Sequence, residues 1–236
     1  MLVWSAMGWR EDGHAQTGCA KPNVAIQPEW PSQPIKRISM KQALLRLCLK
    51  WLTLYFALAH FGMVSVHASE LSDALKKSDH VLLMRHALAP GIGDPAGYTL
   101  KDCKTQRNLD SKGREQAQRT GQWLKAQGIS QALVYSSAWC RCKETAEKLA
   151  LGLPAPEVSL NSFFDDMRQA SQSNQRLQKF IANQLKIKQD QALILVTHHV
   201  NIAEFMGQNV GSGDMVLAKV DAHGKVVSYK VYPSPE

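Results

Sequence analysis

The sequence of 236 residues contains no internal repeat, no apolar run of the ~20 residues that a membrane-spanning helix needs, and no cysteine spacing typical of a zinc finger. Its lysines and arginines alternate with acidic residues, whereas a nucleic-acid-binding protein more often carries a clustered basic face. These absences argue against a structural zinc site and against a nucleic-acid partner.

The first 68 residues differ in composition from the rest. Residues 1–39 are rich in Trp and Pro without a sustained apolar period, so no helix or strand is predicted there. From Met40 a basic lead is followed by a mostly apolar run over 51–66 and by small residues up to Ala68, the layout of a secretory signal peptide. We therefore expect 40–68 to be a signal peptide cleaved after Ala68, with an uncleaved membrane anchor as the alternative. Met40 is then the expected initiator, and 1–39 is expected to be either an upstream extension outside the native protein or a disordered segment.

The remaining residues, 69–236, have the length of one ordinary domain. They hold 21 Lys and Arg against 17 Asp and Glu, a net charge of +4, whereas the whole chain carries +8. Half of the basicity thus belongs to the segment that precedes the domain. The signal predicts a periplasmic or secreted protein with no membrane association after cleavage.

Three cysteines fall within 69–236, namely Cys103, Cys140 and Cys142. An exported protein meets oxidising conditions. We expect one disulfide between Cys103 and either Cys140 or Cys142, and the sequence does not choose between them.

Apolar runs and amphipathic stretches alternate along the domain. Strands are expected over 80–86, 132–137, 158–160 and 192–198, with a terminal hairpin of 216–220 and 226–232. Helices are expected over 71–77, 111–127 with Ser111 as cap, 138–151, 177–187 and 200–206, separated by a long loop at 87–108 and a polar one at 161–175. This alternation predicts an α/β fold: a three-layer α/β/α sandwich with a mainly parallel central sheet and a C-terminal hairpin.

Cationic groups follow three of the expected strands. Arg85 and His86 end the first, Arg141 lies in the helix after the second, and His198 ends the last of the central ones. Ligands of open α/β sheets bind beyond the carboxyl ends of the strands. The three strands would thus deliver positive charge to one crevice, which suits a phosphate.

Four segments carry a family resemblance: 83–87 (LMRHA), 136–146 (SSAWCRCKETA), 196–198 (VTH), and 108–117 at the expected entry of the first long helix. Together they resemble the histidine phosphatase superfamily, which has a phosphoglycerate-mutase-like fold. The resemblance implies that His86 is the nucleophile that takes the phosphoryl group and that Arg85, Arg141 and His198 bind its oxygens, without a metal or other cofactor. Arg107 is either a further ligand or a loop charge, and His199 competes with His198.

The proton donor to the leaving oxygen is expected to be acidic. Asp165 is the candidate, with Asp166 and Glu204 as rivals. The chain also departs from the mutase pattern, because Ala87 replaces the usual Gly and no Asn follows at short distance. Substrate contacts known for mutases are therefore not expected here.

The interpretation is an exported phosphatase that hydrolyses a small phosphorylated substrate through phosphohistidine at His86; no oligomeric state is predicted. One alternative is a non-catalytic phosphate-binding domain of the same fold. Another is a metallohydrolase with zinc on His86, His198 and His199, against which Arg85 and Arg141 argue because they would repel a dication.

Overall fold

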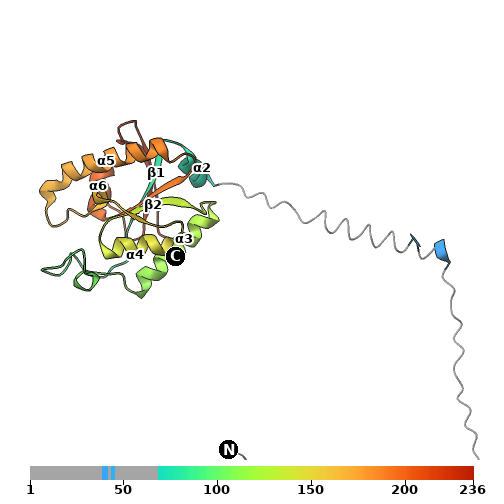
Figure 1. Ribbon diagram of the computed structural model, residues 1–236, viewed down its shortest axis with the longest axis horizontal. Coiled ribbons are helices and arrows are strands. Elements are labelled where there is room, and N and C mark those ends of the chain that lie inside the picture. The colour runs from blue at the N-terminus through green and yellow to red at the C-terminus, as the bar shows by residue number, and fades with distance from the viewer. Residues whose placement is uncertain (1–38, 42–43, 46–68) are drawn as a thin grey trace, which may run out of the picture. The chain divides into compact units, whose positions relative to one another are not determined.

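The structure is a computed structural model that describes residues 39–41, 44–45 and 69–236 (Figure 1). Most of the predicted signal peptide, its cleavage point after Ala68 and nearly all of the upstream segment 1–39 lie outside the described residues, so these boundaries stay predictions. Within the described ranges, no helix has both the length and the apolar character needed to cross a membrane.

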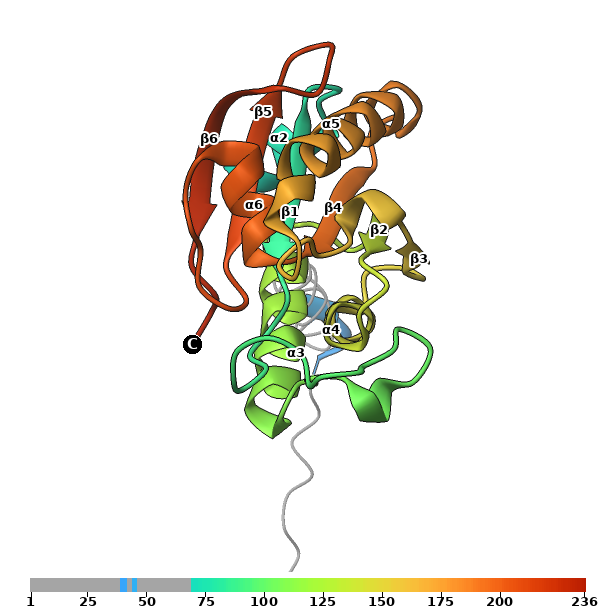
Figure 2. The ribbon, with the colours of Figure 1, turned by 90° about the vertical axis from the view of Figure 1, so that its left-hand side faces the viewer.

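A six-stranded sheet in the order β3-β2-β4-β1-β5-β6 forms the centre of the domain (Figure 2). The strands β3, β2, β4 and β1 run parallel, and β5 and β6 add an antiparallel hairpin at the β1 edge. Their bounds are β1 His80–Arg85, β2 Ala132–Ser136, β3 Ala155–Pro156, β4 Ala192–Thr197, β5 Met215–Val220 and β6 Val226–Tyr232. The mainly parallel sheet and the terminal hairpin confirm the prediction.

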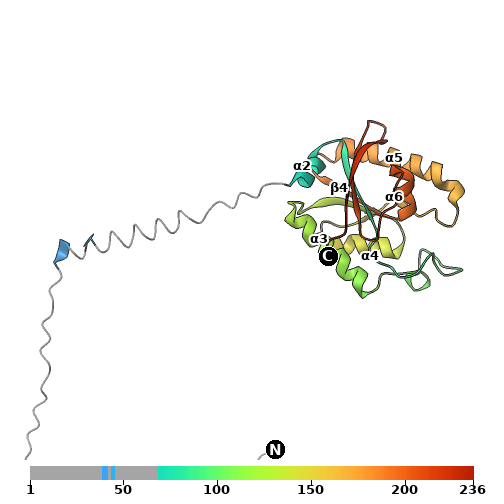
Figure 3. The ribbon, with the colours of Figure 1, turned by 180° about the vertical axis from the view of Figure 1, so that it is seen from behind.

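Helices cover both faces of the sheet, as Figures 1 and 3 show from opposite sides. One apolar cluster joins the sheet to α2, α3 and α4, and a second joins it to α5 and α6. The helices are α2 Glu70–Lys76, α3 Ser111–Ala126, α4 Cys140–Leu149, α5 Ala170–Ile187 and α6 His199–Met206. Since β4 lies between two parallel neighbours and under helices on both faces, all of its residues are buried, which explains its unbroken apolar sequence. The predicted three-layer sandwich is confirmed.

The predicted strand at 158–160 is wrong. Val158–Leu160 is a short 3₁₀ helix, in which the Glu157 side chain accepts a hydrogen bond from the Ser159 N–H. The edge strand lies just before it, at Ala155–Pro156. Proline is tolerated there because an edge strand has a side without ladder hydrogen bonds.

Two helix starts also differ from expectation. Asp110 caps α3, since its carboxylate accepts a hydrogen bond of 2.7 Å from the Gly113 N–H, so Ser111 is the first helical residue and not the cap. The helix α5 begins at Ala170, inside the segment expected to be a polar loop. Only Ser173 of its first two turns is buried, one turn before Leu177, so these turns show no apolar period.

A buried lysine ties the end of α5 to α2. The side chain of Lys188, which is 1% exposed as a residue, donates hydrogen bonds to the backbone carbonyls of Leu75 (2.7 Å), Gln191 (3.0 Å) and Gln189 (3.3 Å). Helix ends leave carbonyls without partners, and a cation there also suits the helix dipole.

The expected disulfide is confirmed, and its partner is Cys140: the Cys103–Cys140 bond joins the long loop to the first residue of α4. Cys142 is a buried thiol, and burial raises its pKa to about 12. The loop itself contains a 3₁₀ helix, Cys103–Thr105.

Replacing both Cys103 and Cys140 by alanine is expected to lower the free energy of unfolding by about 3 kcal/mol, because the cross-link no longer restricts the unfolded chain. Urea unfolding of the variant and of the non-reduced protein measures the difference. Wild-type protein kept in reductant should behave like the variant. Equal unfolding curves for oxidised protein and variant would contradict a stabilising cross-link.

Candidate active site

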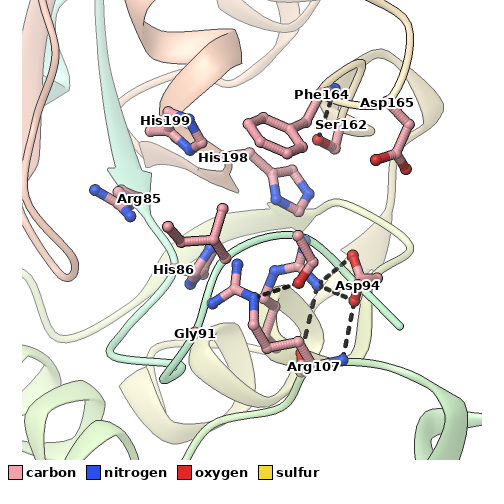
Figure 4. Close-up of a pocket in the computed structure, with 13 residues that line it drawn as sticks. Arg85, His86, Gly91, Asp94, Arg107, Ser162, Phe164, Asp165, His198 and His199 are labelled. Atoms are coloured by element: carbon pink, nitrogen blue, oxygen red, sulfur yellow. Dashed lines mark hydrogen bonds and ion pairs between the residues drawn. The ribbon is translucent and has the colours of Figure 1, made fainter. Parts of the chain in front are cut away.

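The sheet register brings the predicted cationic groups together. Arg85 pairs with Thr197 across β1 and β4, and Ser136 pairs with Val196 across β2 and β4. The residues that follow, His86, Ser137 and His198, therefore leave the sheet at the same end. A pocket of about 260 Å³ opens there, and all six predicted site residues line it: Arg85, His86, Arg107, Arg141, Asp165 and His198 (Figure 4).

His86 is 1% exposed, and its imidazole orientation is fixed by the backbone. Its Nδ1 lies 2.8 Å from the carbonyl oxygen of Ala87. A carbonyl only accepts, so we assign the proton to Nδ1, which leaves the lone pair on Nε2. The main chain is held as well, because the His86 N–H donates to the Thr197 carbonyl at 2.9 Å.

The pKa of His86 is lowered to about 3: burial lowers it most, the hydrogen bond to the Ala87 carbonyl raises it by less, and the charges of Arg141, Arg107 and Arg85 lower it further. The ring is thus neutral at ordinary pH. Neutral imidazole has the free nitrogen that nucleophilic attack requires.

This shift makes the stability of the protein pH-dependent. In the unfolded chain His86 takes up a proton near pH 6.5, whereas in the folded protein it does so only near pH 3. The stability that His86 contributes is therefore fully present above pH 6.5 and is lost as the pH falls toward 3, at up to about 1.4 kcal/mol per pH unit for one proton. The slope of the unfolding free energy against pH, measured across this range, should be smaller in His86→Asn by the equivalent of about one proton. Identical slopes in the variant and in the wild type would contradict the lowered pKa of His86.

Three guanidinium groups surround the His86 ring. Arg85 Nη1 donates to the Val210 carbonyl at 2.7 Å, and Arg107 donates to the carbonyls of Gly93 (2.8 Å from Nε) and Ala89. Arg141 is 3% exposed and lies in the first turn of α4. Burial lowers the pKa of Arg85 and Arg107, yet guanidinium groups stay charged in proteins.

Two buried nitrogens of this group lack a partner. The Nε atoms of Arg85 and Arg141 make no hydrogen bond with any of the residues that the structure describes. Buried donors are normally paired, and a phosphate offers the acceptor oxygens that arginine matches best.

His198 is the last residue before α6 and packs against the wall of the pocket. The Ser137 hydroxyl lies 2.8 Å from its Nε2, and its ring meets the Trp139 ring edge to face, with centroids 5.2 Å apart. Burial and then the neighbouring His86 and Arg141 lower the pKa of His198 well below its ordinary value. Neighbouring His199 also lines the pocket and packs on Phe164.

Asp165 lies at the pocket mouth, on the side opposite Arg107 (Figure 4). It is exposed, and the Tyr98 hydroxyl donates to its Oδ2 at 2.8 Å. The rival acids are not part of the pocket lining: Asp166 pairs with Arg168, and Glu204 is exposed on α6.

The prediction from sequence missed Asp94, whose side chain is 4% exposed and forms an ion pair with Arg141 at 2.9 Å. Asp94 is the single acidic residue between His86 and Asp102, in a loop rich in Gly and Pro. That isolation in a long loop was the available signal. Ser162 and Phe164, which also line the pocket, are not among the predicted site residues.

The described part of the chain contains no group of three or more His, Cys, Asp or Glu side chains arranged to hold a metal ion. The three histidines of the zinc alternative therefore do not form such a group. The charged groups facing His86 are instead mainly guanidinium groups, which are suited to an anion.

Fold and pocket together define an α/β domain that gathers arginines and a neutral histidine at the carboxyl end of its parallel strands. Residues 81–168 match the model of the histidine phosphatase superfamily (branch 1). This confirms the resemblance drawn from the sequence motifs.

No curated protein matches the chain. Among solved structures, a mycobacterial glucosyl-3-phosphoglycerate phosphatase complexed with inorganic phosphate is 14% identical, with a TM-score of 0.49 over 66% of this chain and 97% of that one. The protein histidine phosphatase SixA complexed with tungstate is 19% identical, with a TM-score of 0.45 over 65% and 94%. A phosphoserine phosphatase from Entamoeba histolytica is 13% identical, with a TM-score of 0.47 over 64% and 95%.

Proposed function

We propose that the protein is an exported phosphatase that hydrolyses a phosphomonoester through a phosphohistidine at His86, without a metal. One observation carries the proposal: the Nδ1 proton of His86 is directed to the Ala87 carbonyl, so Nε2 offers a lone pair in a pocket lined by three arginines. Phosphoryl transfer is mostly positioning and charge stabilisation, and these groups supply both.

In the first step, Nε2 of His86 attacks phosphorus and the bond to the ester oxygen breaks. Arg85, Arg107, Arg141 and His198 bind the phosphoryl oxygens, whose charge shifts during transfer. We assign to Asp165, in its protonated form, the donation of a proton to the leaving oxygen. Its exposed carboxylate lines the pocket, where this proposal places the departing alcohol.

In the second step, water attacks the phosphohistidine. The Asp165 carboxylate takes a proton from the water, the bond between nitrogen and phosphorus breaks, and its electron pair returns to Nε2. Phosphate then leaves, and His86 is again neutral with its proton on Nδ1. The cycle consumes one water and no redox partner.

Export is part of the proposal. The predicted signal peptide at 40–68 motivates it, and the Cys103–Cys140 bond supports it because disulfides persist in oxidising compartments. Sequencing the N-terminus of the protein recovered outside the cytoplasm tests it. A chain that stays in the cytoplasm with its N-terminal segment intact would overturn the location.

Turnover of p-nitrophenyl phosphate in the presence of a chelator tests the catalytic proposal. We expect hydrolysis, inhibition by vanadate, and a phosphoryl group on His86 in rapidly quenched protein. Protein that binds phosphate without any turnover would favour the non-catalytic alternative. Activity that the chelator removes would contradict metal independence.

A further inference from the structure

Asp94 is a nearly buried carboxylate among the arginines of the pocket, whereas the other carboxylate of the lining, Asp165, is exposed. Its Oδ1 accepts from Arg141 Nη1 (2.9 Å) and from the Arg107 backbone N–H (2.9 Å). Its Oδ2 accepts from the same Nη1 (3.1 Å) and from the indole N–H of Trp139 (3.0 Å). Four contacts from three residues thus fix one nearly buried side chain.

The contact with Arg141 is one-sided. Both carboxylate oxygens approach the same nitrogen, Nη1, while the buried Nε of Arg141 has no partner among the residues described. Asp94 therefore holds the guanidinium by one end and leaves its other nitrogens uncommitted to this carboxylate. A phosphate oxygen is the acceptor that suits them.

The Trp139 side chain, which donates to Asp94, also contacts His198. The Trp139 ring meets the His198 ring edge to face, and the Arg141 guanidinium carbon lies 6.0 Å from the centre of the same indole. The hydrogen bond to Asp94 restricts rotation of the indole. One carboxylate thus contacts Arg141 directly and His198 through Trp139.

Asp94 places a negative charge in the pocket that is proposed to bind a phosphate. Burial raises its pKa, but hydrogen bonds from the Arg107 N–H and from Arg141 outweigh it, so the net shift is downward and the group stays ionised. A fixed negative charge repels a phosphate by Coulomb's law. Asp94 is therefore unfavourable to anion binding unless the geometry that it imposes on its neighbours outweighs the repulsion.

We propose that Asp94 is a positioning residue of the phosphate site, acting through Arg141 and Trp139. The inference rests on the proposed function, because it assumes that the pocket holds a phosphoryl group. Asp94 itself is not proposed to contact the substrate. It fixes the orientation of Arg141 and of the Trp139 ring that packs on His198.

Asp94→Asn separates positioning from charge, because the two predict opposite signs. The amide has the same shape without the charge, and its NH₂ group would face donors from Arg141, Trp139 or Arg107. We expect the dissociation constant of inorganic phosphate, measured by calorimetry on the full chain, to rise about tenfold. Simple removal of a repulsive charge would instead tighten binding, and unchanged or tighter binding would overturn the proposal.

Glu144→Gln is the matched control. Glu144 lies on α4, as does Arg141, and forms an ion pair of 2.6 Å with Arg114 outside the pocket. Phosphate affinity should change less than about twofold in this variant. A tenfold loss here as well would show that any lost ion pair on α4 disturbs the site, against a specific role for Asp94.

A double-mutant cycle tests the route through Arg141. In an Arg141→Ala background, Asp94→Asn should cause at most the roughly threefold loss of phosphate affinity that belongs to the Trp139 contact, since the arginine that Asp94 positions is gone. The same tenfold loss in both backgrounds would contradict the route. Trp139→Phe keeps the aromatic contact with His198 and removes the indole donor; we expect about a threefold loss, and wild-type affinity would count against the indole contact.

These binding measurements keep the two proposals apart. If wild-type protein binds phosphate but hydrolyses no ester, the proposed function fails while the comparison of Asp94→Asn with wild type still decides the role of Asp94. If wild-type protein hydrolyses the ester and Asp94→Asn binds phosphate normally, only the role of Asp94 fails. Should Asp94→Asn not fold, Trp139→Phe carries the test.

Discussion

Replacing His86 by asparagine is expected to lower the turnover of p-nitrophenyl phosphate by at least about 1,000-fold, the scale on which loss of a nucleophile acts. Asparagine keeps a polar side chain of moderate size but has no nitrogen lone pair for attack on phosphorus. The arginines remain, so phosphate should bind within about tenfold of the wild-type affinity. Initial rates and calorimetry on the same preparations separate the two effects.

His80→Asn is the control for this variant. His80 begins the same strand, β1, and lies next to Asp79 at the end remote from the pocket. Its replacement should leave turnover within about twofold, because His80 does not line the pocket. Turnover that survives in His86→Asn would exclude a phosphohistidine at this residue, whereas a loss shared with His80→Asn would point to damage of the strand.

Replacing Lys188 by methionine is expected to lower the free energy of unfolding by about 3–6 kcal/mol. Methionine has nearly the same shape, so the packing is kept, but the carbonyls of Leu75, Gln189 and Gln191 lose their shared donor. The melting temperature should fall by roughly 6–24 °C for a domain of this size. Thermal and urea unfolding check this value.

Lys179→Met is the control for Lys188→Met. It removes a lysine from the exposed side of α5, the helix that Lys188 follows, and should change the unfolding free energy by less than about 0.5 kcal/mol. An unchanged melting temperature in Lys188→Met would mean that water replaces the ammonium group at these carbonyls. Turnover per folded molecule should stay normal in both variants, because neither lysine lines the pocket.

The sequence predicted those parts of the fold in which local pattern and burial agree. The apolar runs of β1, β4 and β5 were identified because almost all of their residues are buried in the sheet. The first turns of α5 were missed because only Ser173 faces the interior there, and 158–160 was misassigned because three residues are too few to show a period.

The gathering of the candidate site residues in one pocket could be predicted for a related reason. Arg85, His86, Arg141 and His198 were identified because each follows a parallel strand, and the ends of parallel strands meet at one edge. Asp94 could not be found in that way, since its contact with Arg141 depends on the path of the loop 87–108. The choice of Cys140 over Cys142 for the disulfide depends on the same path.

The hydrogen bond from His86 Nδ1 to the Ala87 carbonyl also affects the lifetime of the proposed phosphohistidine. Because the Ala87 carbonyl cannot take up a proton, the ring keeps its Nδ1 hydrogen when Nε2 is phosphorylated and becomes an imidazolium cation. Imidazole departs from such a cation as a neutral leaving group, so the bond to phosphorus is weak and water cleaves it readily. We therefore expect the proposed phosphohistidine to be transient and the resting protein to carry an unmodified His86.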